Sequence, residues 1–318
     1  MKLNNHIKQR FVSDQKLPIQ VFDDPYFDYF LDLYDEDFKT KEKYEMLLNT
    51  LSKYNSQEAF LEDFYKIRDN IIESLKSTEA YKRFIDEKNP DFVKTKDSTP
   101  KFDTISEIAG IKFSKKSDVY SPANVNKCFL SIDLKKANFQ VLKKYDKNIV
   151  FGANTYEEML EKFTDLEYIK SSKYIREVIF GCINTGRQVA MQRYYTAKLL
   201  EWLIDNKIVN SEDVYVFTND EIVIYMSNEM SPEKCEELKV KINKCLDLEV
   251  SVEYFCLKMI GEKDYFVKEL NTGEIKFKAI PAAYYPQIYK KYKGLPLNDN
   301  DLLFYFEKRL AKFINPLF

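Results

Sequence analysis

The spacing of apolar residues changes along this chain, and that change is what most restricts the fold. Between residues 25 and 89 apolar side chains recur three or four positions apart, which is the period of an amphipathic helix. Beyond about residue 127 they gather in short runs rich in β-branched and aromatic residues, which are typical of strands. A chain of 318 residues with both patterns is expected to be an α+β protein of more than one domain.

The first part is expected to hold three or four helices and to end in a linker. Ser56, followed by Gln57 and Glu58, is typical of a helix start, and the Asn89-Pro90 pair is expected to end a helix. Residues 93–103 are polar and include a proline, so they are the expected linker. The predicted domains are a helical, thumb-like or accessory domain over 1–103, a mixed domain over 104–275, and an aromatic and basic segment over 276–318 that closes with an amphipathic helix at about 300–313.

The mixed part contains three segments with strand character. Residues 127–133 form an apolar run that ends on an acid, residues 213–226 form two β-rich runs around a polar turn, and residues 248–259 alternate. Helical patterns lie among them, at 156–163, 172–180, 187–206 and 232–246. We expect an antiparallel sheet with helices on one face, in which the 214–226 hairpin lies beside the strand that ends at Asp133. A parallel sheet stays open as the alternative, because helices separate the strands.

Scarce residue types exclude several kinds of site. Seven glycines, with no P-loop or dinucleotide-binding pattern among them, exclude both of those phosphate-binding loops. The single histidine, His6, lies near an end that is expected to fray, and the five cysteines include no C-x-x-C pair. A zinc site and a Ser-His or Cys-His triad are therefore not expected.

The charge and the N-terminal sequence indicate a protein of the cell interior. The 49 basic and 51 acidic residues give a net charge of −2, so the chain as a whole does not attract nucleic acid, and only a local basic surface would. The N-terminus lacks the apolar core of a signal peptide, and no run approaches the ~18 apolar residues of a membrane span. We expect a soluble cytoplasmic protein with reduced cysteines and no membrane partner.

Asp133 and Asp220 are the acids that stand where predicted strands end. Two carboxylates on strand ends can share divalent metal ions, and Mg²⁺ needs only one or two carboxylates beside the phosphate oxygens of a substrate. The alternative is structural: an Asn-Asp pair is common in hairpin turns because both residues tolerate left-handed backbone geometry, and an acid at a strand end is often merely solvated.

Several segments resemble known polymerase motifs in the same order along the chain. Residues 129–142 and 214–226 resemble motifs A and C of the palm domain of template-dependent polymerases, most closely those of the DNA polymerase I family. Residues 172–181 are similar to that family's fingers helix, in which a basic residue precedes a Phe-Gly pair by four positions. Residues 186–203 are similar to the helix that leads into motif C, and the resemblance covers about 127–268.

This resemblance implies a catalytic and nucleotide-binding site. Asp133 and Asp220 would hold Mg²⁺ or Mn²⁺ for phosphoryl transfer, and Glu221 would be an accessory acid. The nucleoside triphosphate would meet residues of the fingers helix and of the sugar-selectivity position, where the family's usual acid is replaced. These nucleotide-binding residues are Lys173, Arg176, Phe180 and Asn138.

A second set of residues is expected to contact the template and primer. Arg187 and Gln188 begin the helix before motif C, although a buried polar cap would explain them equally well. Tyr285, Lys290 and Lys291 belong to a segment that interleaves aromatic rings with positive charge, a composition that suits base stacking and phosphate contact. A solvated turn is the alternative for this segment.

The departures from the family leave other functions open. Residues 133 and 220 are 87 positions apart (220 − 133), too few for complete fingers, so a protein partner is one way to complete the site. We expect a small template-dependent DNA or RNA polymerase. The alternatives are a reverse-transcriptase-like polymerase and a non-catalytic palm-like protein that binds nucleic acid or a larger polymerase in replication or transcription. A nucleotide cyclase with a glycine-glycine-acid-acid turn is disfavoured, because Thr218 and Asn219 replace both glycines.

Overall fold

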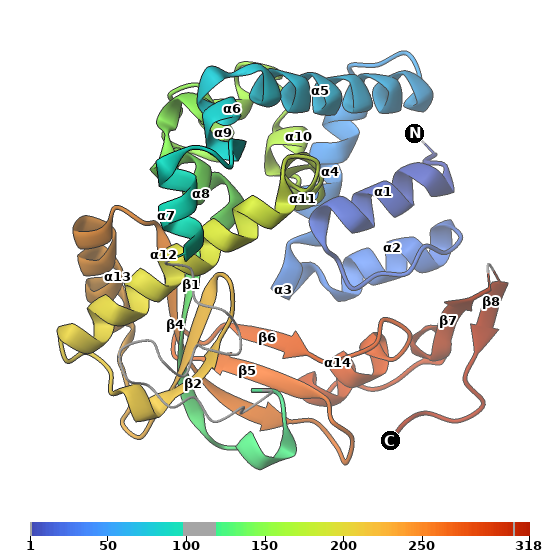
Figure 1. Cartoon of the computed structure of the whole chain (residues 1–318). Helices are drawn as coiled ribbons and strands as arrows, with labels where there is room; N and C mark the ends of the chain where they lie inside the picture. Colours follow the sequence, from blue (N-terminus) through green and yellow to red (C-terminus); the bar gives the residue numbers. More distant parts are fainter. Residues whose placement is uncertain (1, 98–118, 308) are drawn as a thin grey trace.

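The computed structural model describes residues 2–97, 119–307 and 309–318. A group of helices lies along one side of a six-stranded antiparallel sheet, and α12 (Thr185–Asp205) runs between the two (Figure 1). The predicted α+β class and the antiparallel arrangement are confirmed. The domain boundary predicted at residue 103 lies outside the described residues.

The N-terminal helices agree with the sequence pattern in most respects. Ser56 accepts a hydrogen bond from the amide of Ala59 and so begins the longest of them, as predicted. The Asn89-Pro90 pair begins a helix instead of ending one, because proline lacks only an amide that the first turn leaves unpaired. The helices are α1 (Asn5–Gln15), α2 (Asp24–Leu33), α3 (Asp35–Phe38), α4 (Thr40–Leu51), α5 (Gln57–Ser77), α6 (Glu79–Ile85) and α7 (Pro90–Asp97).

Two expectations about the N-terminal region need correction, one about α1 and one about the predicted linker. α1 is not frayed, because Ile7 and Phe11 are fully buried against the other helices and Asn4 caps its start. At the other end of this region, residues 93–97 of the predicted linker belong to α7, and residues 98–103 lie outside the described part of the chain.

All pairs in the six-stranded sheet are antiparallel, in the order β2-β3-β1-β4-β5-β6. As predicted, the β2–β3 hairpin lies beside β1, and Asp133 stands opposite Glu221. The β5–β6 hairpin, which the sequence pattern did not indicate, extends the sheet beyond β4. The strands are β1 (Cys128–Leu134), β2 (Val214–Phe217), β3 (Glu221–Met226), β4 (Val250–Met259), β5 (Phe266–Leu270) and β6 (Ile275–Lys278).

The two faces of the sheet differ because side chains alternate along each strand. Leu130, Ile132 and Leu134 of β1 pack on α12 and α13 (Pro232–Leu246) and form one core. Phe129 points to the opposite face and packs with residues of β3, β4 and β5. Asp133 lies on this second face by the same alternation, at the end of β1.

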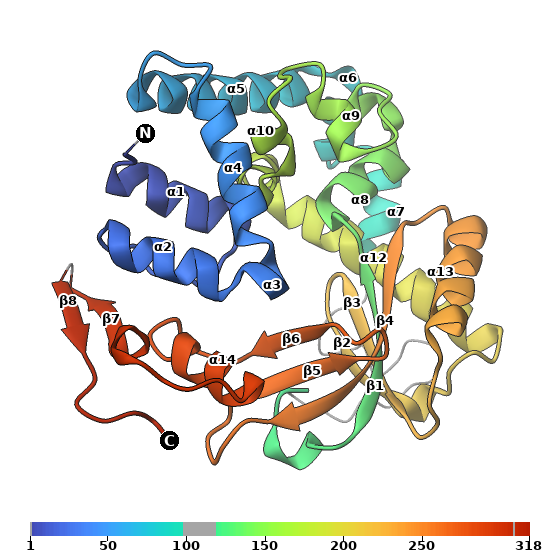
Figure 2. The ribbon, with the colours of Figure 1, turned by 180° about the vertical axis from the view of Figure 1, so that it is seen from behind.

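Most of the remaining helices lie among or beside the N-terminal ones (Figure 2). They contribute residues to the same hydrophobic core. Phe60 of α5 meets Tyr168, and Phe84 of α6 meets Tyr145, with ring centroids 6.1 Å and 5.1 Å apart. These helices are α8 (Ala137–Tyr145), α9 (Tyr156–Leu160), α10 (Glu167–Ser171), α11 (Lys173–Gly181) and α14 (Tyr285–Lys293), and the 3₁₀ turns are η2 (Pro122–Asn124), η3 (Lys147–Val150), η4 (Ser211–Asp213) and η5 (Asp299–Leu302).

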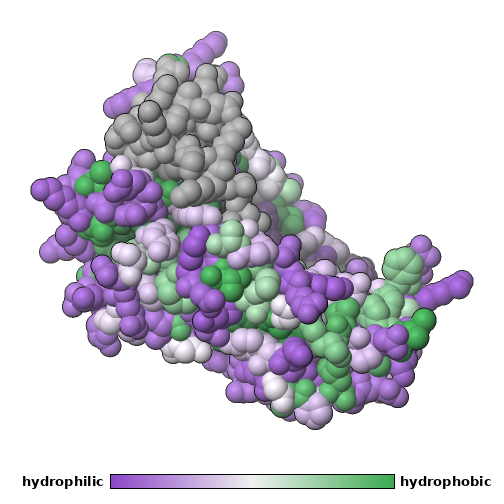
Figure 3. Space-filling model, turned by 90° about the horizontal axis from the view of Figure 1, so that it is seen from below, coloured by the Kyte–Doolittle hydropathy of each residue, from purple (hydrophilic) through white to green (hydrophobic). Residues whose placement is uncertain are grey.

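The chain closes with a hairpin, so the predicted helix at 300–313 is wrong. β7 (Leu303–Phe306) pairs with β8 (Arg309–Lys312), and the amide of Tyr305 donates to the side chain of Gln20 near α2. Aromatic residues adjacent in sequence favour strand over helix here. Several apolar side chains of this segment are exposed, and Figure 3 shows apolar patches among the hydrophilic residues of this side of the molecule.

Cys128 and Cys256 form a disulfide, which corrects the expectation of five reduced thiols. The two residues stand directly opposite each other where β1 pairs with β4. The sequence gives no sign of this pairing, because 128 positions separate the two cysteines. In the described part of the chain, no helix combines the length and the apolar character needed to cross a membrane.

Candidate active site

A cavity of about 500 Å³ lies where the end of β1 meets the helices. Its lining comes from β1, the first turn of α8, one side of α11, the start of α12 and the turn between β2 and β3. Six residues predicted from sequence meet in this lining: Asp133, Asn138, Lys173, Arg176, Phe180 and Asp220.

The two aspartates are brought together by strand pairing. The amide of Leu134 donates to the backbone carbonyl of Asp220 over 2.8 Å, which fixes the turn beside the end of β1. Within the turn, the hydroxyl of Thr218 accepts from the amide of Glu221 over 3.0 Å and lies 3.3 Å from Asp220 Oδ1. The β-rich hairpin and its polar turn thus place Asp220 at the cavity next to Asp133.

The surroundings of Asp133 favour its neutral form. Burial raises the pKa of this carboxyl to about 7, and the negative charge of Asp220 acts in the same direction. Glu221 and Glu253 add to the effect, whereas Lys268 opposes it. A cation placed between the two aspartates would relieve this repulsion, so the arrangement is suited to binding one.

Glu221 lies outside the lining of the cavity. Its side chain accepts a hydrogen bond from the hydroxyl of Ser131 over 2.5 Å, on the sheet face that also carries Glu253. Glu253 is in turn paired with Lys268 at 3.2 Å and with Lys276 at 2.5 Å. Glu221 therefore acts on Asp133 through its charge and does not line the cavity.

Lys173 and Arg176 lie one helical turn apart and face the cavity from α11. Ser172 caps this helix by accepting from the amide of Ile175. Lys173 lies 3.8 Å from the carboxylate of Glu177, and the guanidinium of Arg176 lies 5.8 Å from the centre of the Tyr156 ring. The two cations thus line the same cavity as the two aspartates.

Three polar residues of α12, which the sequence analysis did not predict, hold the turn that carries Asp220 and the first turn of α8. Arg193 donates to Asn219 Oδ1 over 3.0 Å and 3.3 Å, and Thr196 donates to the carbonyl of Asn219 over 2.8 Å. Gln192 donates to the side chain of Asn138 in the first turn of α8. Their spacing at i, i+1 and i+4 in an otherwise apolar helix face is the signal that could have found them.

Arg187 and Gln188 are not available to nucleic acid, which corrects that expectation. Arg187 is 4% exposed and its guanidinium lies 4.2 Å from the centre of the Phe92 ring. Gln188 is buried and donates to the carbonyls of Phe180 and Ile183. The alternative of a buried polar cap describes both residues, because the start of α12 is enclosed by α7 and α11.

Two of the three C-terminal residues predicted to contact nucleic acid are buried in the fold instead. Tyr285 is buried against Tyr34, and Lys290 is buried in an ion pair with Asp301 at 2.8 Å. Both were expected to contact nucleic acid, and α14 instead turns them toward the core. Lys291 is exposed, with its ammonium group 5.0 Å from the centre of the Phe318 ring.

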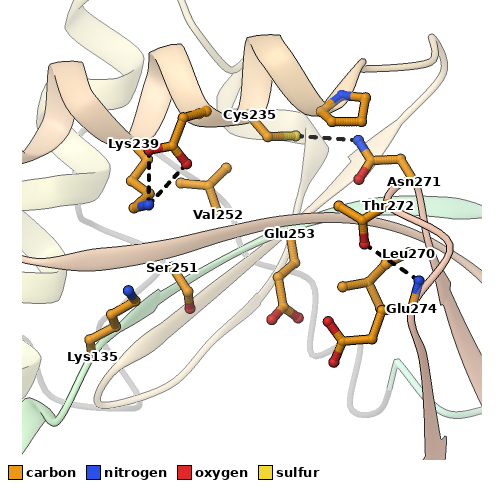
Figure 4. Close-up of a pocket in the computed structure, with 12 residues that line it drawn as sticks. Lys135, Cys235, Lys239, Ser251, Val252, Glu253, Leu270, Asn271, Thr272 and Glu274 are labelled. Carbon is orange, nitrogen blue, oxygen red and sulfur yellow. Dashed lines mark hydrogen bonds and ion pairs between the residues drawn. The ribbon is translucent and has the colours of Figure 1, made fainter. Parts of the chain in front are cut away.

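A smaller cavity of about 240 Å³ lies between α13 and the turn that joins β5 to β6 (Figure 4). The side chain of Asn271 points toward Cys235 of α13, with Nδ2 3.6 Å from the sulfur, and also donates to the carbonyl of Met230. Lys239 is paired with Glu236 along the helix. Charges of both signs line this cavity, and none of the predicted site residues does.

The donor set of the larger cavity fits magnesium only when a substrate is present. Among the described residues there is no group of three or more His, Cys, Asp or Glu side chains that could hold a metal ion. Two carboxylates at one cavity remain, and Mg²⁺ commonly takes one or two carboxylates and completes its shell with water and substrate phosphates. The pair therefore fits a magnesium ion that arrives with a nucleotide, and does not fit a permanent structural metal.

Comparison with models of known protein families, with curated proteins and with solved structures gives no match for this chain.

Proposed function

We propose that this chain is a nucleotidyltransferase, a small template-dependent DNA or RNA polymerase that uses Mg²⁺ or Mn²⁺. The observation that carries the proposal is the cavity at the end of β1, which is lined by one carboxylate from β1, one from the turn between β2 and β3, and two cations from α11. Phosphoryl transfer to a nucleotide needs this combination, because negative charge on the triphosphate must be neutralised at both ends.

The residues that line the cavity would have different roles in the reaction. Asp133 and Asp220 would hold the metal ions, which when bound would stabilise the charge on the attacking 3′ oxygen and on the departing pyrophosphate. Arg176 would bind the triphosphate through two parallel hydrogen bonds, and Lys173 would add a second charge. The first turn of α8 also lines the cavity, and no described side chain caps its amides, which suits contact with an anion.

Two further residues would bind the rest of the nucleotide. Asn138 lies in the lining five positions after Asp133 and is held by Gln192, so its amide is fixed for contact with the sugar. Phe180 supplies an apolar wall from α11. The template requirement rests on the resemblance to palm-domain motifs, and the antiparallel sheet with the hairpin beside β1 supports that resemblance.

Primer extension tests this proposal. The full chain would be incubated with labelled DNA or RNA primers on templates, each set of nucleoside triphosphates, and Mg²⁺ or Mn²⁺. We expect elongation by the unaltered chain and a loss of roughly a hundredfold or more in kcat for Asp220→Asn, because a missing metal ligand weakens the transition state more than substrate binding. The matched control is Asp264→Asn, an exposed acid in the turn between β4 and β5.

The same assay separates catalysis from an accessory role. If no set of substrates is extended, and binding of the primer–template is the same for the unaltered chain and for Asp133→Asn, the chain is not a polymerase on its own. That outcome would favour a palm-like protein that binds nucleic acid or a larger polymerase.

A further inference from the structure

A separate cavity of about 260 Å³ lies between α1 and α11. These helices pack against each other, and α11 contributes Tyr174 to this cavity while it contributes Lys173 and Arg176 to the candidate active site (Figure 1). The cavity shares none of its lining with the candidate active site. Its lining consists of His6, Gln9, Arg10, Ser13 and Tyr174.

The lining residues of α1 form one stripe of the helix. Residues 6, 9, 10 and 13 recur three or four positions apart, so they lie on the same face. Ile7 and Phe11 occupy the opposite face and are fully buried. All five lining side chains can donate hydrogen bonds, and the described lining contains no carboxylate, so the cavity presents donors to a ligand.

Arg10 gives the cavity a mostly buried guanidinium group, two of whose nitrogens make no hydrogen bond with any described group although Nη2 donates to the hydroxyl of Tyr65 over 3.3 Å. Its side chain is 12% exposed, and its guanidinium lies 4.3 Å from the centre of the Tyr174 ring and 5.2 Å from that of Phe64. Nη1 lies 3.5 Å from Asp14 Oδ1, yet Nη1 and Nε make no hydrogen bond with any described group. Burial raises the pKa of Asp14 to about 6, so this carboxylate is charged at neutral pH and loses its charge, and with it its attraction for Arg10, in mildly acidic solution.

We propose that the cavity between α1 and α11 binds a phosphate group. Arg10 supplies the charge, and His6, Ser13 and Tyr174 donate hydrogen bonds to the phosphate oxygens, the donor types that recognise such anions. The phosphate belongs either to a free ion or nucleotide or to the backbone of a nucleic acid. This inference does not depend on the proposed polymerase activity.

Isothermal titration calorimetry with inorganic phosphate tests the site. The full chain would carry Arg176→Gln, so that phosphate binding in the candidate active site is weakened. We expect one phosphate per chain, with affinity reduced about tenfold by His6→Gln and by Ser13→Ala, because each removes one charge-assisted hydrogen bond. Arg10→Lys keeps the charge but loses the planar fork and should weaken binding further.

The control replaces a basic residue of the same region that lines no described cavity. Lys82→Gln on α6 should leave the affinity unchanged, since Lys82 is exposed and paired with Glu79. His6 is exposed and Ser13 half-buried, so these two variants give an answer even if Arg10→Lys does not fold. The proposal would be overturned by the absence of any heat of binding at millimolar phosphate, or by His6→Gln and Ser13→Ala chains that bind phosphate as tightly as the chain without these two changes.

A second titration identifies the source of the phosphate. Fluorescence anisotropy would follow labelled single strands with and without a 5′ phosphate. If the site binds a nucleic-acid backbone, His6→Gln weakens binding of both strands and inorganic phosphate competes with them. If it binds a free phosphate or nucleotide, the strands bind equally to the His6→Gln and unaltered chains while the calorimetric difference remains.

Discussion

Asp133 links the stability of the fold to the candidate active site. Burial and its acidic neighbours raise the pKa of the folded carboxyl to about 7, above the ordinary value of 3.8. Between about pH 4 and pH 7 the folded state therefore holds a proton that the unfolded chain releases. Stability is highest below this range, falls as the pH rises through it, and the loss is complete above about pH 7.

Asp133→Asn should remove this pH dependence. The uncharged amide has no ionisation cost, so the variant should be more stable than the unaltered chain at pH 8 by about 1–3 kcal/mol and similar to it at pH 4. Urea unfolding at several pH values without divalent metal measures this difference. Asp264→Asn, an exposed turn acid, should follow the unaltered chain. Equal pH profiles for the Asp133→Asn and unaltered chains would show that the surroundings of Asp133 do not raise the pKa of its carboxyl.

The surroundings of single side chains were only partly predictable from the sequence. The alternation of β1 and the turn after β2 brought Asp133 and Asp220 to one cavity as predicted, because strand register fixes where such side chains point. Arg187 and Lys290 lie on helices, and a charged residue does not reveal which neighbours will enclose its helix. Arg187 is buried against the rings of Phe84 and Phe92, and Lys290 lies 5.6 Å from the centre of the Tyr29 ring, all of them partners far away in sequence.

At the scale of elements, α12 acts as the support of the candidate site. It donates from Arg193 and Thr196 to Asn219, the residue before Asp220, and from Gln192 to Asn138. The same helix packs its apolar side on the sheet. One element therefore fixes both the turn that carries Asp220 and the first turn of α8, which follows Asp133, and this is the arrangement expected when a site needs precise geometry.

Thr196→Val tests the role of this helix. The change keeps the shape of the side chain but removes its hydrogen bond to the carbonyl of Asn219, so stability should fall by about 1 kcal/mol. If the bond positions Asp220, kcat for primer extension should fall about tenfold while KM for the nucleotide changes little. Thr196→Ser should restore both values. An equal loss of stability with unchanged kcat would show that the bond is structural only.

Helices and strands were predicted well from the sequence where the spacing of apolar residues fits either a helical or a strand period, but not both. β1 and the β2–β3 hairpin end at acids and turn residues, and the structure has them where the sequence placed them. The segment at 300–313 has apolar residues that satisfy both a helical and a strand period, and its strand form is fixed by contact of Tyr305 with Phe22 and Gln20. These partners lie about 280 positions away, so local pattern could not reveal them.

At the scale of the whole molecule, the helices before residue 98 belong to the same core as those after residue 119. Tyr168 donates to the carboxylate of Asp14 over 2.8 Å, and Tyr34 packs on Tyr289 with ring centroids 5.1 Å apart. The N-terminal helices therefore contact both the middle and the C-terminal segments. We expect a core shared in this way to unfold as one cooperative unit.

A fragment of residues 119–318 should consequently not fold on its own. Without the N-terminal helices, Tyr168, Tyr289 and the apolar side of α11 lose their cover, and the exposed apolar surface should produce aggregation or a loosely packed state. Near-ultraviolet circular dichroism and thermal unfolding of the fragment and of the full chain would measure this. The full chain should show one transition for both the aromatic signal and the far-ultraviolet signal. A fragment that keeps the aromatic signal and melts cooperatively near the temperature of the full chain would show instead that the sheet and its helices form an independent domain, as the sequence pattern first indicated.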